Sequence, residues 1–404
     1  MSTIKLGLIK EGKIPIDKRV PLAPYQCKQL LEQYPNLEIY IQLSEIRAFK
    51  DEEYSSLGLE VRDNLDNCDI LMGIKEVPVD DLIPGKKYLF FSHSIKAQAY
   101  NRKLLQTILE KNIQLIDYER LTDHRGFRVL GFGRYAGIVG GNNGIITFGK
   151  RNNLFDLKPA HLCKDRAEME EQLREVKLPN IKIVITGEGR VAGGVMEILN
   201  VLNIRKVTPR EYIDNQFDEP VYCQLGVTEY NIHIDGKPRE ESDFFAHPEN
   251  YKSAFLPYAK TTDLFISCHF WDPLAPVLFT KEDMRSPDFN ISVIVDISCD
   301  INGSVPSTLK STTSDNPVYG YNPITEQIDE PYSERTITVL AVDTLPNELP
   351  RDASEEFGKN LMESVFPHLF AEDTSEMIEK ATITKNGELT EKYQYLSDFV
   401  KGSG

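Results

Sequence analysis

The chain has 404 residues, beyond the size at which a single hydrophobic core stops growing, so two domains are expected. Its composition, 41% apolar and 27% charged residues, excludes collagenous, coiled-coil and low-complexity proteins. The formal net charge of −16 argues against a nucleic acid as partner, because binding phosphates requires a clustered basic surface.

Membrane, secreted and metal-binding classes are also disfavoured. No apolar run approaches the roughly 20 residues that a spanning helix needs, so no membrane partner is expected. The amino end shows no signal-peptide core, and the cysteines are scattered without a CxxC pair. These patterns predict a cytoplasmic protein without a metal site.

Short apolar runs alternate with segments of helical spacing through the first third of the chain. Strands are predicted at residues 4–9, 37–43, 70–74, 88–92 and 113–118, and helices at 23–34 and 98–110. This alternation is typical of the α/β class, with parallel sheets covered by helices on both faces.

A second α/β unit is predicted from a strand at residues 181–186 onwards. Before it lie a glycine-rich segment that we interpret as a tightly packed helix or turn joining two domains, and a solvated helix without an apolar stripe, at 135–149 and 164–177. Residues 209–260 are interpreted as a long insert. After it we predict strands and one helix, at 264–267, 292–296, 336–342 and 354–369.

The most informative motif is a glycine-rich turn of the GxGxxA form, Gly187-Glu188-Gly189-Arg190-Val191-Ala192. In a dinucleotide fingerprint the first glycine permits the turn, the second lets the backbone approach the pyrophosphate, and the small third residue lets helix pack on strand. The motif follows an apolar strand and opens an apolar helix. We therefore predict that Gly187, Gly189, Arg190, Val191 and Ala192 bind a nicotinamide dinucleotide at a helix amino terminus. The alternative is a purely structural turn.

The choice between NAD and NADP stays open. An acidic residue about 20 positions after the turn would bind the adenosine ribose. The next predicted strand, residues 206–208, instead ends at Thr208 without one, close to Arg205 and Lys206. Basic side chains tolerate a 2′-phosphate, although they are equally typical of a protein surface. Thr208 is included among the candidate cofactor-binding residues.

Three motifs upstream of the glycine turn resemble the alanine dehydrogenase and transhydrogenase superfamily. They are Asp17-Lys18-Arg19-Val20-Pro21-Leu22-Ala23-Pro24, Gly73-Ile74-Lys75-Glu76-Val77-Pro78 and Phe91-Ser92-His93-Ser94-Ile95-Lys96-Ala97-Gln98. Within that group the chain resembles the lysine-ketoglutarate reductase domain, a lysine-forming saccharopine dehydrogenase. Further motifs that carry this closer resemblance are found at residues 115–119, 123–129, 295–300 and 343–350.

The resemblance implies two Rossmann-like domains with parallel sheets and an active-site cleft between them. A discontinuous substrate-binding domain would comprise residues 1–135 and 336–404, and a dinucleotide-binding domain residues 136–335. The implied substrates are saccharopine, L-lysine and 2-oxoglutarate. L-Lysine and 2-oxoglutarate form an imine, which hydride from NAD(P)H reduces to saccharopine. The direction of flux and the oligomeric state stay open.

The resemblance also assigns roles to single residues. Lys75 matches the family's base and His93 its general acid, while Glu76, Glu119 and Asp343 match supporting acids. A lysine can act as a base only where burial or nearby cations lower its pKa. By residue type alone, a Lys-Glu pair or a lone histidine at a strand end is more often solvated or structural.

Saccharopine carries three carboxylates, so its site needs cationic anchors. Arg19 and Arg128 offer the bidentate fork that suits a carboxylate, and Lys96 and Gln98 match substrate-contacting positions of the family. Two alternatives remain open. One is an alanine dehydrogenase-like enzyme acting on another pair of 2-oxo acid and amino acid, and the other is a non-catalytic NAD(P)-binding sensor.

Overall fold

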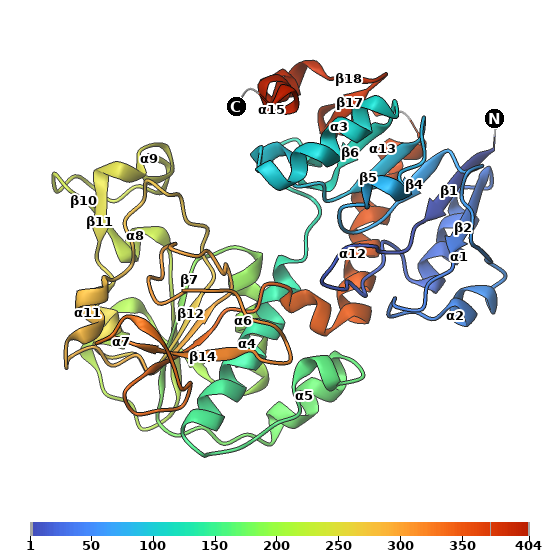
Figure 1. The fold of residues 1–404 in the computed structure, drawn as a ribbon. Helices are drawn as coiled ribbons and strands as arrows, with labels where there is room; N and C mark the ends of the chain where they lie inside the picture. The colour runs from blue at the N-terminus through green and yellow to red at the C-terminus, as the bar shows by residue number, and fades with distance from the viewer. Residues whose placement is uncertain (1–2, 372, 403–404) are drawn as a thin grey trace. The chain divides into compact units, whose positions relative to one another are not determined.

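The computed structural model describes residues 3–371 and 373–402 and divides into two compact units (Figure 1). The first unit comprises Met1–Phe132 and Pro350–Gly404, and the second comprises Gly133–Leu349. Each contains one eight-stranded, predominantly parallel sheet with helices packed on it. The predicted α/β class is therefore confirmed. None of the helices in the described part of the chain is long and apolar enough to cross a membrane.

Six parallel strands form the centre of the first unit's sheet, in the order β3-β2-β1-β4-β5-β6. This is the strand order of a dinucleotide-binding sheet, and its direction of winding reverses between β1 and β4, where such folds bind ligands outside the carboxyl ends of the strands. The six are β1 (Ile4–Leu8), β2 (Leu37–Gln42), β3 (Glu60–Arg62), β4 (Ile70–Met72), β5 (Lys87–Phe90) and β6 (Gln114–Asp117). Beyond β6 the sheet ends with two antiparallel strands, β17 (Thr382–Lys385) and β18 (Glu388–Leu389).

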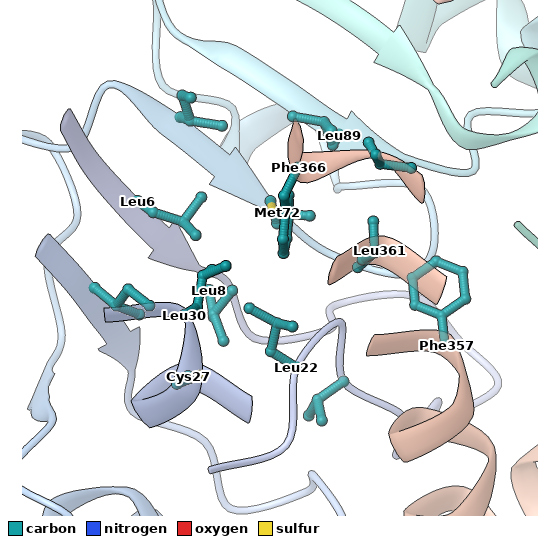
Figure 2. Packing of buried hydrophobic residues seen from close by; sticks show 14 of the residues in the cluster. Leu6, Leu8, Leu22, Cys27, Leu30, Met72, Leu89, Phe357, Leu361 and Phe366 are labelled. Carbon is teal, nitrogen blue, oxygen red and sulfur yellow. The ribbon is translucent and has the colours of Figure 1, made fainter. Parts of the chain in front are cut away.

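One face of this sheet packs against helices from both ends of the chain. Cys27 and Leu30 of α1 (Pro24–Gln33) and Phe357 and Leu361 of α12 (Pro350–Ser364) meet the strand residue Met72 in one buried cluster (Figure 2). On the opposite face, α3 (Arg102–Glu110) contributes to a second cluster. The carboxyl-terminal segment is thus part of the first unit's core. The helix predicted at 354–369 is divided into α12 and α13 (Phe366–Phe370).

The second unit's sheet has the parallel order β8-β9-β7-β12-β13-β16. Its strands are β7 (Lys182–Thr186), β8 (Arg205–Lys206), β9 (Val221–Leu225), β12 (Leu264–Ser267), β13 (Val293–Asp296) and β16 (Ile337–Leu340), followed by antiparallel β14 (Val318–Asn322) and β15 (Gln327–Asp329). The boundary expected at residue 336 differs from that of the units, because β16 pairs with both β13 and β14. The chain returns to the first unit only at Pro350.

Residues 209–260, interpreted above as an insert, contain a strand of the central sheet. β9 pairs along its whole length with β7, and β8 lies outside it at the sheet edge. The remainder forms α7 (Pro209–Asp214), α8 (Val227–Tyr230), the hairpin of β10 (Asn231–His233) and β11 (Tyr251–Ser253), α9 (Glu241–Ala246) and α10 (Leu256–Ala259). Tyr230, Phe244 and Tyr251 are buried in the unit's core, so the segment is an integral part of it.

The glycine-rich segment forms the helix α4 (Gly133–Arg151), which packs against α6 (Arg190–Val201). A Cβ at Gly137 would overlap the Val191 carbonyl oxygen, and one at Gly194 the Arg134 carbonyl oxygen. The glycines therefore allow direct contact between the two helix backbones. The solvated helix expected at 164–177 is α5 (Arg166–Arg174), which does bury apolar residues, Met169 and Leu173, at i,i+4 spacing.

Candidate active site

The glycine turn lies between β7 and α6. Gly187 has a φ of +95°, and a Cβ there would lie 2.9 Å from the Cys268 carbonyl oxygen. Its N–H donates to the Leu225 carbonyl oxygen at 2.8 Å. The turn is therefore held between the ends of β9 and β12, and only glycine has both the conformation and the size that it requires.

The start of α6 fits a pyrophosphate. Gly189 is the N-cap of this helix, and a Cβ at Gly189 or Gly193 would meet no heavy atom within 4 Å. Ala192 is fully buried, as the fingerprint requires of its third small residue. Arg190 is exposed and Val191 half-buried in the first turn. Open space beside the first-turn N–H groups at a helix amino terminus suits an anionic ligand.

A hollow of about 460 Å³ adjoins this turn at the ends of β8 and β9. Its lining includes Lys206 and Gln224, whose Nζ and Oε1 are hydrogen-bonded at 2.8 Å, and the carboxylates of Glu188, Glu211 and Glu229. Thr208 also lines it and caps α7, accepting from Glu211 N–H at 3.3 Å. The strand beside β7 in the sheet is β9, whereas β8, which ends before Thr208, lies at the sheet edge. Glu229 follows β9 within the hollow.

The candidate base belongs to the first unit. Lys75 follows β4 and is half-buried. Burial is the main cause that lowers the pKa of its ammonium, and the positive charge of Arg19 lowers it further. Both effects disfavour the charged form of a lysine. Lys75 therefore loses its proton at a lower pH than an exposed lysine does.

Glu76 binds two side chains. Its carboxylate binds His93 Nδ1 at 2.7 Å and accepts from Lys13 Nζ at 2.6 Å. Burial raises the pKa of Glu76, but the hydrogen bonds from His93 and Lys13 outweigh it and bring the pKa to about 2. His93 follows β5 in the left-handed region, with φ of +52°. The contact with Glu76 thus fixes the orientation of the imidazole.

Arg19 has a partner that the sequence analysis did not assign. Its Nε donates to Asp17 Oδ1 at 2.9 Å and its Nη2 to Asp17 Oδ2 at 2.5 Å, and the guanidinium lies over the Phe132 ring. Burial raises the pKa of Asp17, but the charge and hydrogen bonds of Arg19 lower it below its ordinary value. The Arg19 guanidinium, which was expected to bind a substrate carboxylate, is therefore bound to Asp17 beside Lys75.

The remaining candidates are dispersed. Glu119 follows β6, and its Oε1 accepts from Arg128 Nη2 at 3.1 Å. Lys96 and Gln98 are exposed on the loop after His93. Asp343 is exposed after β16 in the second unit. The structure thus brings Arg19, Lys75, Glu76 and His93 together, with Glu119 and Arg128 at the same strand-end edge.

Two buried carboxyls were missed. Asp117 ends β6 and accepts from Ser92 N–H at 3.2 Å, from the Ser92 hydroxyl and from Glu119 N–H at 2.7 Å. Burial is the main cause that raises its pKa, to about 6. Asp117 therefore anchors the loop that carries His93. Glu11, after β1, binds the backbone of Lys75 in the same way. An acid that closes an apolar strand was the only signal for Asp117.

Two family models match the chain. The alanine dehydrogenase/PNT N-terminal domain matches residues 7–139, and the C-terminal domain of the same family matches residues 224–392. The chain belongs to the alanine dehydrogenase/PNT family. The first match contains Arg19, Lys75 and His93, whereas the glycine turn lies between the two matched ranges.

The chain is similar to proteins with two different names. The chain is 28% identical over 98% of its length to the alpha-aminoadipic semialdehyde synthase of Arabidopsis thaliana, and 28% identical over 97% to that of Mus musculus. It spans less than half of those proteins, 42% and 47%. It is also 28% identical to a saccharopine dehydrogenase (NAD(+), L-lysine-forming) of Candida glabrata, covering 90% of this chain and 91% of that one.

Solved structures share the family fold. An L-alanine dehydrogenase matches with a TM-score of 0.65 and 16% identity, over 98% of this chain and 100% of that chain. A transhydrogenase from Sinorhizobium meliloti matches with a TM-score of 0.58 and 14% identity, over 96% and 98% of the two chains. At these identities the likeness concerns the fold alone.

Replacing Glu76 by glutamine should destabilise this family member in a pH-dependent way. The lowered pKa of Glu76 means that its ion pairs stabilise the fold above pH 4.5, the ordinary value, and that this stability is lost as the pH falls toward 2. Urea unfolding at pH 7 should show a loss of about 2 kcal/mol that shrinks below pH 4.5. Glu60→Gln, which removes an exposed pair with Arg62, should cost under about 0.5 kcal/mol. A Glu76→Gln loss that is equal at pH 7 and pH 3.5 would contradict the assignment.

Proposed function

We propose that the chain catalyses the reversible, NAD(P)-dependent interconversion of saccharopine with L-lysine and 2-oxoglutarate. The observation that carries the proposal is the arrangement of Lys75, Glu76 and His93 at the strand ends of the first unit. The glycine turn in the second unit supports the cofactor class. The similarity to an L-lysine-forming saccharopine dehydrogenase of Candida glabrata supports the lysine substrate.

The two candidate catalytic groups suit different proton transfers. The ε-amine of lysine must lose a proton before it attacks the 2-oxo carbon, and Lys75, whose pKa is lowered, accepts it. Imine formation expels the carbonyl oxygen as water, and His93, paired with Glu76, donates a proton to that oxygen. NAD(P)H supplies the hydride that reduces the imine carbon.

The substrate's carboxylates require anchors that are accessible. Lys96, Gln98 and Arg128 are exposed beyond the ends of β5 and β6 and take this role in the proposal. Arg19 is buried and paired with Asp17, so its first role is to lower the pKa of Lys75. A substrate carboxylate would have to share Arg19 with Asp17.

An initial-rate assay with both cofactors tests the function. NADH or NADPH oxidation should require lysine and 2-oxoglutarate together, with saccharopine as the product identified by mass spectrometry. Turnover with pyruvate and ammonia in place of these substrates would indicate an alanine dehydrogenase-like enzyme. Binding of the dinucleotide without turnover of either pair would indicate a sensor.

NADH should be used more efficiently than NADPH. The hollow beside the glycine turn holds three carboxylates and one ammonium, and the 2′-phosphate of NADPH adds two negative charges. Replacing Glu229 by glutamine should narrow the ratio of kcat/KM for NADH to that for NADPH by roughly fivefold, equivalent to about 1 kcal/mol. Glu219→Gln removes a nearby charge that pairs with Arg205 outside the hollow, and should leave the ratio within twofold. A wild-type preference for NADPH would refute the prediction.

A further inference from the structure

Glu11 is a buried acid that the proposed chemistry does not use. It lies in the segment after β1, and its side chain reaches the segment after the neighbouring strand β4. Its Oε1 accepts from Ile74 N–H at 2.6 Å and its Oε2 from Lys75 N–H at 2.9 Å. One carboxylate therefore joins two strand ends at the point where the sheet reverses its direction of winding.

The structure leaves room for this contact. A Cβ at Gly73 would lie 2.8 Å from Ile9 Cδ1 and 3.2 Å from Glu11 Oε1. A larger residue before Ile74 would therefore displace the carboxyl from the N–H groups that it binds. Glycine at this position and glutamate at position 11 act together, although they are far apart in the sequence.

A carboxylate is a costly choice for a structural anchor here. Burial disfavours its charge, and the neighbouring carboxylate of Asp17 adds repulsion. A glutamine side chain would avoid both costs but has only one oxygen for two N–H donors. The ionised carboxyl is the group that accepts from both peptides at once.

We propose that Glu11 is a positioning residue for Lys75, holding the Ile74 and Lys75 peptides so that the Lys75 amine keeps one place beside Arg19 and Asp17. The proposal rests on the proposed function for its kinetic consequence alone. The geometric claim, that Glu11 acts through the backbone of Lys75, concerns the first unit and stands independently of the substrate.

The positioning of Lys75 by Glu11 should depend on pH. Burial is the main cause that raises the pKa of Glu11, to about 8, and the charge of Asp17 raises it further. The hydrogen bonds from the two N–H groups and the charge of Arg19 lower this pKa but do not outweigh burial. The charged groups that face it are Asp17 and Arg19, and the hydroxyl of Tyr118 also faces it. Lys75 contacts it through the backbone N–H. A protonated carboxyl keeps one strong acceptor oxygen, whereas the ionised form has two. Glu11 therefore binds the Ile74 and Lys75 N–H groups more strongly as the pH rises through this range. The Lys75 ammonium also loses its proton as the pH rises.

Replacing Glu11 by glutamine tests the proposal. We expect kcat to fall at least tenfold, the KM for the dinucleotide to stay within twofold, and the alkaline limb of the pH profile to shift. The matched control is Asp263→Asn in the second unit, a largely buried carboxyl that accepts from Lys182 N–H at 2.8 Å. That variant should lose stability without changing the pH profile.

A second readout does not depend on the substrate. Acetylation of Lys75 by acetic anhydride, followed by peptide mass spectrometry across pH, reports the pKa and exposure of its amine. In Glu11→Gln the midpoint should move toward that of an ordinary lysine. Unchanged reactivity of Lys75 in that variant would overturn the inference. If the wild type turned over neither cofactor with lysine and 2-oxoglutarate, the proposed function would fail while this readout still decided on Glu11.

The conservative variant and a double-mutant cycle separate positioning from folding. Glu11→Asp keeps the charge on a shorter stem and should give intermediate kcat and intermediate Lys75 reactivity, even if Glu11→Gln does not fold. Glu11→Asp should add no kinetic loss in a Lys75→Met background, because it acts through that residue. Wild-type behaviour of Glu11→Asp in both readouts, or full additivity in the cycle, would overturn the inference.

Discussion

Methionine in place of Lys75 should lower kcat/KM for saccharopine formation by about 10²- to 10⁴-fold, the usual contribution of a general base. Methionine has similar bulk and no amine, so packing beside Arg19 is largely retained. Burial and the charge of Arg19 lower the pKa of Lys75, so at a given pH more of it is neutral than of an exposed lysine. Among the lysines that the structure describes in the first unit, Lys75 is the one at the end of β4. Steady-state rates over pH, with dinucleotide binding measured by fluorescence, check the prediction.

The control for Lys75→Met is a lysine at the same edge of the sheet. Lys10 is exposed after β1, and Lys10→Met should keep kcat/KM within twofold. Binding of NADH should be unchanged in both variants, because the glycine turn belongs to the second unit. More than a tenth of wild-type activity in Lys75→Met would show that another group is the base.

Alanine at Gly194 should destabilise the second unit strongly. Its Cβ would overlap the Arg134 carbonyl oxygen and approach Ile138 N to 2.8 Å, so backbone rather than a flexible side chain must move. We expect a loss of about 3 kcal/mol or more, or roughly 6–12 °C in Tm. Dinucleotide affinity should also fall, since α6 begins in the glycine turn. Differential scanning calorimetry and fluorescence titration measure both.

The adjacent glycine supplies the matched control. Gly193 lies in the same helix, but a Cβ there meets no heavy atom within 4 Å. Gly193→Ala should be neutral or raise the stability by up to about 1 kcal/mol through helix propensity. Equal losses from the two substitutions would show that the contact between α4 and α6 does not decide stability.

Local patterns predicted the elements that bury a continuous apolar run. The runs at residues 4–9 and 88–92 became β1 and β5, and the glycine turn stands between β7 and α6 as its motif indicates. β9 was not predicted, because Val221–Leu225 is short and lies in a polar, aromatic segment without a clear hydrophobic period. Its assignment comes only from pairing with β7, which is non-local.

The candidate site shows the same division. Lys75 and His93 were found through the resemblance to a family, which carries information that residue type alone lacks. Glu11 and Asp117 were not found, because each accepts from a backbone N–H far away in the sequence, 64 and 25 residues respectively, and no local pattern reveals these contacts. The Asp17 partner of Arg19 lies only two residues away. A search for short-range acid–arginine pairs would have detected it.

The contact between α4 and α6 has a mechanical consequence. α4 begins at Gly133, the residue at which the chain passes from the first unit to the second, and its first turns touch the backbone of α6 without intervening side chains. Backbones in direct contact leave no soft layer to absorb a shift. A ligand that displaced the start of α6 would carry the start of α4, and hence this connection, along with it. The connecting peptide at Gly133 would therefore move together with the dinucleotide turn.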